Sequence, residues 1–254
     1  MAPARDKRAA WRVISASVPG ADHVRNDEES QDAAAWRVRS DLLIAAVADG
    51  AGSARLGGTG ARIAVRAAVE SLRSARMADL RRRVDRCLRA AHAAALEAIR
   101  QEAHRLEAEP KELATTLSAI VAAPGQVASL QIGDGAVVVA CRNGDLELMS
   151  APQSGEFINE TSFLTGDASI DSAALRVFEC GAAHVAAMTD GLLRLAIRLS
   201  DGAPHAPFFA PLFRYVSHPG TDPDGDRLAE FLRADRVRER TGDDLTLLLA
   251  ALTE

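Results

Sequence analysis

Four apolar runs of this chain end or begin at aspartate, and this pattern limits the possible folds more than any other feature. Three runs stop at an Asp-Gly pair and the fourth starts after Asp-Asp; the pairs are Asp49-Gly50, Asp134-Gly135, Asp190-Gly191 and Asp243-Asp244. Each run has the length and apolar content of a buried strand. One Asp-Gly taken alone is typical of a turn. Antiparallel strands that enter and leave one sheet edge would bring all four pairs to that edge.

The remaining sequence alternates between extended and helical patterns. Strands are expected at residues 11–18, 36–38, 42–48, 114–122, 127–132, 136–141, 146–149, 174–178, 184–189 and 245–252. Helices are expected at residues 63–72, 77–106, 191–199 and 228–234. With no linker or repeat, this order predicts one α+β domain over residues 1–254, with helices covering packed antiparallel sheets and residues 1–10 as a flexible N-terminus.

Three connections are expected between these elements. Residues 21–32 are polar and acidic and predict a loop. Residues 150–172 are long for a connection, which favours a flap over a cleft. Residues 200–226 form a Pro- and Gly-rich insertion, in which Phe208 to Tyr215 fit either a short amphipathic helix on the core or a docking surface.

Aspartates gathered at one edge point to a divalent cation. Crowded carboxylates repel one another and raise each other's pKa, and a cation removes that cost. Carboxylate and carbonyl oxygens suit Mg²⁺ or Mn²⁺, and no Cys or His shares the spacing, which argues against zinc. Two such ions about 3.5–4 Å apart can lower the pKa of a water held between them and clamp a phosphate. A glycine after each aspartate would let its backbone carbonyl approach a metal.

Composition excludes several classes of protein. A net charge of −5 leaves no basic excess for a nucleic-acid coat. No apolar stretch approaches the ~20 residues of a membrane span, and the N-terminus lacks the apolar core of a signal peptide. Cys87, Cys141 and Cys180 form neither a disulfide framework nor a zinc spacing. We therefore expect a cytoplasmic protein that binds no nucleic acid and no membrane.

The glycines from Gly50 to Gly60 allow a second interpretation. A Gly-rich stretch between a strand and a helix invites a nucleotide or S-adenosylmethionine site. The G-x-G-x-x-G pattern fails because Arg55 stands at its third glycine. This alternative would also leave Asp134, Asp190 and Asp243 without a role.

Six short segments together resemble the metal-dependent serine/threonine protein phosphatases of the type 2C (PPM) family, in its bacterial subgroup. The segments are SQDA at 30–33, ADGAGSARLGGTGAR at 48–62, ATTLSAIVA at 114–122, IGDG at 132–135, MTDGL at 188–192 and GDDLTLLLA at 242–250. The resemblance runs from about residue 14 to residue 252. It implies a four-layer α/β/β/α sandwich and direct hydrolysis of phosphoserine or phosphothreonine at two or three Mn²⁺ or Mg²⁺ ions.

The same resemblance implies roles for particular residues. Asp49 is similar to the aspartate that bridges two metals, and Gly50 to the carbonyl ligand. Asp190 and Asp243 resemble the other ligands of the first metal, and Asp134 with Asp190 those of a third. Gln31 and Asp32 occupy the position of a Glu-Asp pair that holds the second metal directly or through water.

Some positions depart from the family pattern. Gln31 replaces a carboxylate, Ala51 stands where a histidine often donates a proton, and Asp27 occupies the place of a phosphate-binding arginine. His23 and Arg25 lie nearby; His23 is the candidate for proton donation or phosphate contact, and Arg25 for phosphate binding. These departures keep open a second hypothesis, a phosphatase-like module that binds phosphoprotein or a signalling partner with little or no turnover. The resemblance also implies a monomer that acts opposite a serine/threonine kinase.

Overall fold

Two antiparallel sheets of five strands form the centre of this computed structural model, which describes residues 9–149, 162–166, 169–222 and 224–253. Sheet 1 has the order β1 (Ala10–Val18), β10 (Leu245–Thr253), β9 (Ala182–Met188), β6 (Ala136–Cys141) and β7 (Leu146–Leu148). Sheet 2 has the order β2 (Ala33–Arg39), β3 (Leu42–Ala48), β4 (Leu117–Ala123), β5 (Gln126–Ile132) and β8 (Ala174–Glu179). Every neighbouring pair is antiparallel, and β6 and β7 pair around the Asn143-Gly144 turn.

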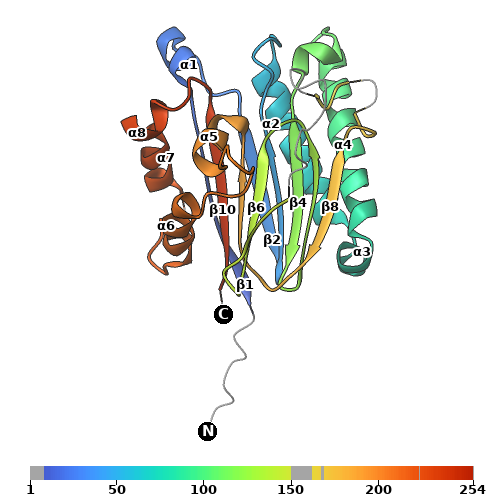
Figure 1. The fold of residues 1–254 in the computed structure, drawn as a ribbon. Helices are drawn as coiled ribbons and strands as arrows, with labels where there is room; N and C mark the ends of the chain where they lie inside the picture. The colour runs from blue at the N-terminus through green and yellow to red at the C-terminus, as the bar shows by residue number, and fades with distance from the viewer. Residues whose placement is uncertain (1–8, 150–161, 167–168, 223, 254) are drawn as a thin grey trace.

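Helices cover the outer face of each sheet, so the molecule has four layers (Figure 1). Sheet 2 is covered by α2 (Gly57–Ser74) and α4 (Val84–Arg105), with α3 (Met77–Arg82) beside them. Sheet 1 is covered by α5 (Leu193–Ala196), α6 (Ala206–Ser217), α7 (Asp226–Arg233) and α8 (Asp235–Arg238). Two 3₁₀ turns, η1 (Pro110–Leu113) and η2 (Asp190–Leu192), complete the described elements. This architecture confirms the predicted α/β/β/α sandwich.

Strand β3 shows why the central strands are apolar throughout. Its alternate residues Leu42 and Ile44 pack in the layer between sheet 2 and its helices, whereas Leu43 and Ala45 pack between the two sheets. A strand buried on both faces cannot alternate with polar residues. The continuous apolar run that precedes Asp49 is therefore a consequence of its central position.

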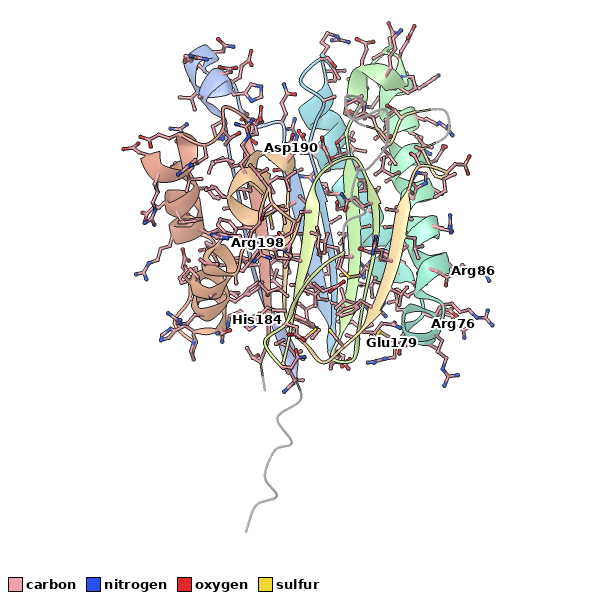
Figure 2. The ribbon with its side chains drawn as sticks, viewed as in Figure 1. Arg76, Arg86, Glu179, His184, Asp190 and Arg198 are labelled. Atoms are coloured by element: carbon pink, nitrogen blue, oxygen red, sulfur yellow. The ribbon has the colours of Figure 1, made fainter. Side chains whose placement is uncertain are left out.

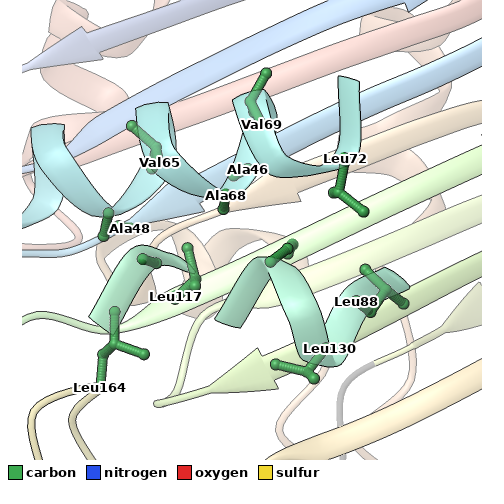
Figure 3. Close-up of a cluster of buried hydrophobic side chains, with 14 of the residues drawn as sticks. Ala46, Ala48, Val65, Ala68, Val69, Leu72, Leu88, Leu117, Leu130 and Leu164 are labelled. Carbon is green, nitrogen blue, oxygen red and sulfur yellow. The ribbon is translucent and has the colours of Figure 1, made fainter. Parts of the chain in front are cut away.

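Helix α2 buries apolar side chains in the layer against sheet 2. Val65, Ala68, Val69 and Leu72 belong to one core cluster with Ala46 of β3 and Leu88 of α4 (Figure 3). Apolar residues at three- and four-residue spacing create this buried stripe. The helix expected over residues 63–72 lies within α2, and the helical pattern expected over residues 77–106 covers α3 and α4.

The structure corrects several sequence expectations. The helix expected over residues 77–106 is two helices, because Arg83 leaves helical geometry (φ −138°, ψ 43°) between α3 and α4. The loop expected over residues 21–32 begins with helix α1 (Ala21–Asn26). The insertion at 200–226 contains α6, which confirms the amphipathic helix predicted around Phe208 to Tyr215. Ala10, expected to be flexible, already pairs in β1.

Two further findings concern the exclusions made from the sequence. No helix in the described part of the chain is both long and apolar enough to span a membrane. The three cysteines are free thiols, as expected from their spacing. Most of the expected flap at 150–172 lies outside the described residues, at 150–161 and 167–168.

Candidate metal centre

A cleft of about 440 Å³ opens at the edge of the sandwich where the acidic strand ends meet. Its walls carry carboxylates from both sheets, together with histidine, glutamine and glycine; the carboxylates are Asp22, Asp49, Asp134, Asp190, Asp243 and Asp244. Figure 2 shows Asp190 at this upper edge, with Glu179 and His184 toward the opposite edge. The predicted convergence of all four aspartate pairs is therefore present.

The backbone at Asp49 is fixed by two threonines that precede β4. The Asp49 N–H donates to Thr116 Oγ1 at 2.9 Å, and the Thr116 N–H donates back to the Asp49 carbonyl at 2.8 Å. Thr115 Oγ1 also donates to that carbonyl at 2.7 Å. Both hydroxyls thus hold the end of β3 in place.

Two of the glycines after aspartate are required by packing. A Cβ on Gly50 would lie 2.4 Å from the carbonyl carbon of Gly57, and one on Gly191 would lie 2.2 Å from the carbonyl oxygen of Asp244. Real Cβ contacts are not this short, so any side chain would push these segments apart. The glycines therefore let the acidic loops touch one another, a reason that the sequence analysis did not give.

Three carboxylates form the centre of the cleft. Asp49, Asp134 and Asp190 each offer an oxygen atom, and these atoms lie within 4.8 Å of one another. Burial, together with the charges of Asp190, Asp134 and Asp244, raises the pKa of Asp49 to about 7. Burial, followed by the charges of Asp134 and Asp243, raises the pKa of Asp190 to about 6. The site thus holds negative charge that the protein does not compensate, which is the condition for binding a cation.

Gln31 lines the cleft, and Asp32, the residue before β2, lies buried behind it. Asp32 is 6% exposed and accepts a hydrogen bond from Thr189 Oγ1 at 2.7 Å. Burial and the charge of Asp49 raise the pKa of Asp32 well above the ordinary value. Gln31 Oε1 is buried and has no hydrogen-bond partner among the residues that the structure describes, although buried polar atoms are nearly always paired. An amide oxygen with no partner, beside several carboxylates, fits a site for a hard divalent ion.

Asp243 and Asp244 are adjacent in sequence but differ in surroundings. Asp243 is exposed at the rim, and its charge contributes to the raised pKa of Asp190. Asp244 is 7% exposed and accepts N–H bonds from Gly20 and Gln31, each at 2.6 Å. Its Oδ1 also lies 2.7 Å from His23 Nδ1. This carboxylate therefore ties α1 and the loop before β2 to the start of β10.

Not every predicted site residue reaches the cleft. His23 lines it, with Nε2 3.8 Å from Glu28 Oε2. Arg25 lies exposed on α1, pairs with Asp22, and is not among the residues that line the cleft. Asp27 ends α1 in the left-handed region (φ 56°). Ala51 lines the cleft in place of a histidine.

Sequence reasoning missed two contributors to this site. It gave no separate role to Asp244, which was named only as part of the Asp243-Asp244 pair, and none to Thr189. The Thr189 hydroxyl joins Asp32 to the Thr246 N–H, which donates to it at 3.1 Å. Only the doubled acid before β10 could have indicated Asp244, and nothing in the sequence distinguishes Thr189 from other strand threonines.

Comparison with known proteins agrees with this geometry. Residues 19–233 match the model of a family described as protein phosphatase 2C. The chain is 37% identical over 261 residues to serine/threonine-protein phosphatase 3 of Escherichia coli (strain K12), an alignment that covers 96% of this chain and 100% of that protein. The chain therefore belongs to the protein phosphatase 2C family, and the alternative of a nucleotide or S-adenosylmethionine site is set aside.

Solved structures share the fold. The catalytic domain of the phosphatase PstP, in complex with two manganese ions, has a TM-score of 0.63 at 20% identity; the match covers 97% of this chain and 100% of that one. The serine/threonine phosphatase Stp1 from Staphylococcus aureus has a TM-score of 0.66 at 14% identity, covering 96% of both chains. These likenesses support the four-layer architecture.

Proposed function

We propose that this chain is a metal-dependent protein phosphatase that hydrolyses phosphoserine and phosphothreonine. The observation that carries the proposal is the convergence of Asp49, Asp134 and Asp190 within 4.8 Å in an open cleft. Family membership and the named activity of the Escherichia coli relative support the same reaction. A phosphorylated side chain of another protein can enter such an open cleft from solvent.

The residues of the cleft suit two or three Mn²⁺ or Mg²⁺ ions. In this proposal Asp49 and the Gly50 carbonyl would contact the first two ions. Asp190 and Asp243 would be the other ligands of the first ion. Gln31 and Asp32 serve the second ion, directly or through water, and Asp134 with Asp190 serves a third. The ions, when bound, would supply an activated water and neutralise the charge on the phosphate.

His23 and Asp244 have a separate role in this proposal. The Asp244 carboxylate, 2.7 Å from Nδ1, selects the tautomer with the proton on that nitrogen and fixes the ring beside the cleft. With a second proton on Nε2, His23 would be placed to donate from that nitrogen to a phosphate oxygen or to the departing serine or threonine oxygen. Arg25 stays a candidate for phosphate binding, but its pairing with Asp22 makes His23 the better one.

A phosphoprotein substrate requires an enzyme that makes it. A protein serine/threonine kinase must therefore act before this reaction, and we propose one as a pathway partner, with this chain acting as a monomer in the cytoplasm. The alternative, a phosphatase-like binding module without turnover, rests on the departures at Gln31, Asp27 and Ala51. The convergence of Asp49, Asp134 and Asp190 supports turnover instead, because a module freed from catalysis would not need these carboxylates.

Release of phosphate from a phosphoserine peptide, with and without Mn²⁺, tests the proposed activity. We expect release by the wild type only with metal, loss of release in Asp49→Asn, and unchanged release in Asp171→Asn, an exposed aspartate outside the cleft. Binding of the phosphopeptide without turnover by the wild type would instead favour the binding module.

A second measurement tests His23. p-Nitrophenyl phosphate has a leaving group that needs no proton, whereas a serine alkoxide does. If His23 is the proton donor, His23→Ala slows the phosphopeptide and spares the aryl phosphate; if it binds phosphate, both substrates slow. Two unchanged rates would remove His23 from the mechanism.

A further inference from the structure

An apolar groove of about 500 Å³ lies between α6 and α7, on the outer layer of sheet 1 and away from the residues of the acidic cleft. Aromatic and proline side chains line most of it. They include Phe208, Pro211 and Tyr215 from α6 and Phe231 from α7. The described residues leave this groove open to solvent, and the metal chemistry does not use it.

The fold accounts for these aromatic side chains only in part. Helix α6 buries Phe209, Phe213 and Val216 against sheet 1. Phe208 and Tyr215, seven positions apart on the neighbouring face, pack against the same core but remain half-buried, and the Phe208 ring lies 6.4 Å from that of Phe231. A surface helix usually carries polar residues on such a face. Half-buried apolar side chains gathered in one groove are typical of a binding surface.

Two arginines give the groove its charge. Arg227 and Arg236 line it, and the Arg236 guanidinium lies 5.7 Å from the centre of the Phe231 ring. Within the described ranges, neither arginine takes part in an ion pair or a side-chain hydrogen bond. Of the described residues that line the groove none is acidic, so its lining is positive although the whole chain carries a charge of −5. Arginine beside aromatic rings suits carboxylate groups next to an apolar anchor.

Tyr215 contributes its ring to the groove. Its hydroxyl oxygen is shielded from solvent and has no hydrogen-bond partner among the described residues, so a bound chain would contact the ring and not the hydroxyl. An apolar groove with a few placed polar groups, here the two guanidinium groups, is the usual form of a peptide-binding site.

From these features we infer that the α6–α7 groove binds a linear segment of a partner protein that presents a leucine or phenylalanine side chain flanked by acidic residues. On the proposed function, on which this step rests, the partner is the phosphoprotein substrate. Only residues 237–242 separate Arg236 from Asp243 at the rim of the cleft. A substrate anchored in the groove is therefore held by the same stretch of chain that completes the metal site.

Fluorescence anisotropy with labelled peptides tests the groove without metal and without phosphate. The probe is Glu-Asp-Leu-Phe-Asp-Glu, with a second peptide in which lysine replaces every acidic residue. We expect the wild-type chain to bind the acidic probe with a Kd below about 1 mM. The Kd of the lysine peptide should be at least about tenfold higher, because its ammonium groups would face Arg227 and Arg236 instead of carboxylates. Arg227→Glu with Arg236→Glu should weaken the acidic probe at least about tenfold.

Matched variants separate a specific groove from general charge. Arg214→Glu with Arg233→Glu makes the same charge change on α6 and α7, at exposed residues that do not line the groove, and should leave binding unchanged. Absence of binding to the acidic probe, equal binding of both peptides, or equal loss in both double variants would overturn the inference.

Turnover distinguishes this inference from the proposed function. With Mn²⁺, the groove variant should hydrolyse p-nitrophenyl phosphate like the wild type. It should also lose efficiency on a phosphoserine peptide that carries the acidic probe sequence, mainly through KM. If the wild type hydrolyses neither substrate but still binds the probe, the proposed function fails and the groove assignment stands.

Discussion

Asp49 and Asp244 are carboxylates of one cleft with opposite surroundings. Asp244 is satisfied by the protein, because two backbone N–H groups and the His23 ring converge on it. Asp49 faces the carboxylates of Asp190 and Asp134, and its pKa is raised to about 7. Asp244 is therefore part of the fold, whereas Asp49 is held in an environment that favours a cation. Substitutions at the two positions should affect stability in opposite directions.

Asp49→Asn should produce the largest effect. Loss of the central carboxylate should lower metal-dependent phosphopeptide hydrolysis by roughly 10³-fold or more, because the metals supply several kcal/mol of charge stabilisation. The same change removes a repelled charge, so the metal-free protein should melt at the same or a higher temperature. Assays with Mn²⁺ and thermal unfolding in EDTA measure the two effects. A metal-free variant that melts well below the wild type would contradict this account of Asp49.

Asp244→Ala should instead destabilise the fold. It leaves the Gly20 and Gln31 N–H groups without partners, and each buried donor costs about 1–3 kcal/mol. We expect urea unfolding to show a loss of about 2–4 kcal/mol in the free energy of unfolding. Asp244→Asn keeps one acceptor and should lose less. A stable Asp244→Ala variant would show that these hydrogen bonds are not needed.

The pH dependence of stability sharpens the same comparison. Asp49 has a folded pKa of about 7 against an ordinary 3.8, so between these values the unfolded chain releases this proton and the folded chain keeps it. The metal-free wild type should therefore lose stability as pH rises from about 4 to about 7, relative to Asp49→Asn, and the difference should level off above that range. Urea unfolding of both proteins in EDTA measures it. A difference that is constant with pH would contradict the raised pKa.

Thr115→Val should give the smallest effect. The substitution removes one hydroxyl donor to the Asp49 carbonyl but leaves the Thr116 N–H bond to the same atom. We expect a loss of about 1 kcal/mol in the free energy of unfolding. The rate with Mn²⁺ should fall less than in Asp49→Asn, since the carboxylate itself is kept. Loss of all activity would show that the loop depends on this hydroxyl more than the geometry indicates.

The sequence predicted those parts of the molecule that depend on periodicity or on unbalanced charge. Helix α2 and strand β3 show apolar patterns set by burial on known faces. The acidic cluster was predictable because three apolar runs end at Asp49, Asp134 and Asp190, and crowded carboxylates favour a compensating cation. Helix α6 was predicted as one of two possibilities for Phe208 to Tyr215; Pro207 lies in its first turn, where proline is tolerated, and burial of Phe209 and Phe213 outweighs Pro211.

Features that depend on contacts distant in sequence could not be predicted. The role of Asp244 arises from Gly20 and Gln31, more than 200 positions away, and no local pattern records it. The break at Arg83 is a similar case, since residues 77–106 keep a helical pattern across it. The packing reason for Gly50 also appears only when Gly57 is brought against it.

The pairing of the first and last strands has a practical consequence. Ala10 lies opposite Thr253, so the two ends of the folded chain leave the molecule side by side, at the edge away from Asp190 (Figures 1 and 2). A short peptide could join them, and the chain could be reopened at the exposed Asn143-Gly144 turn as a circular permutant. A reporter fused just before β1 or just after β10 would likewise start at the edge away from Asp190.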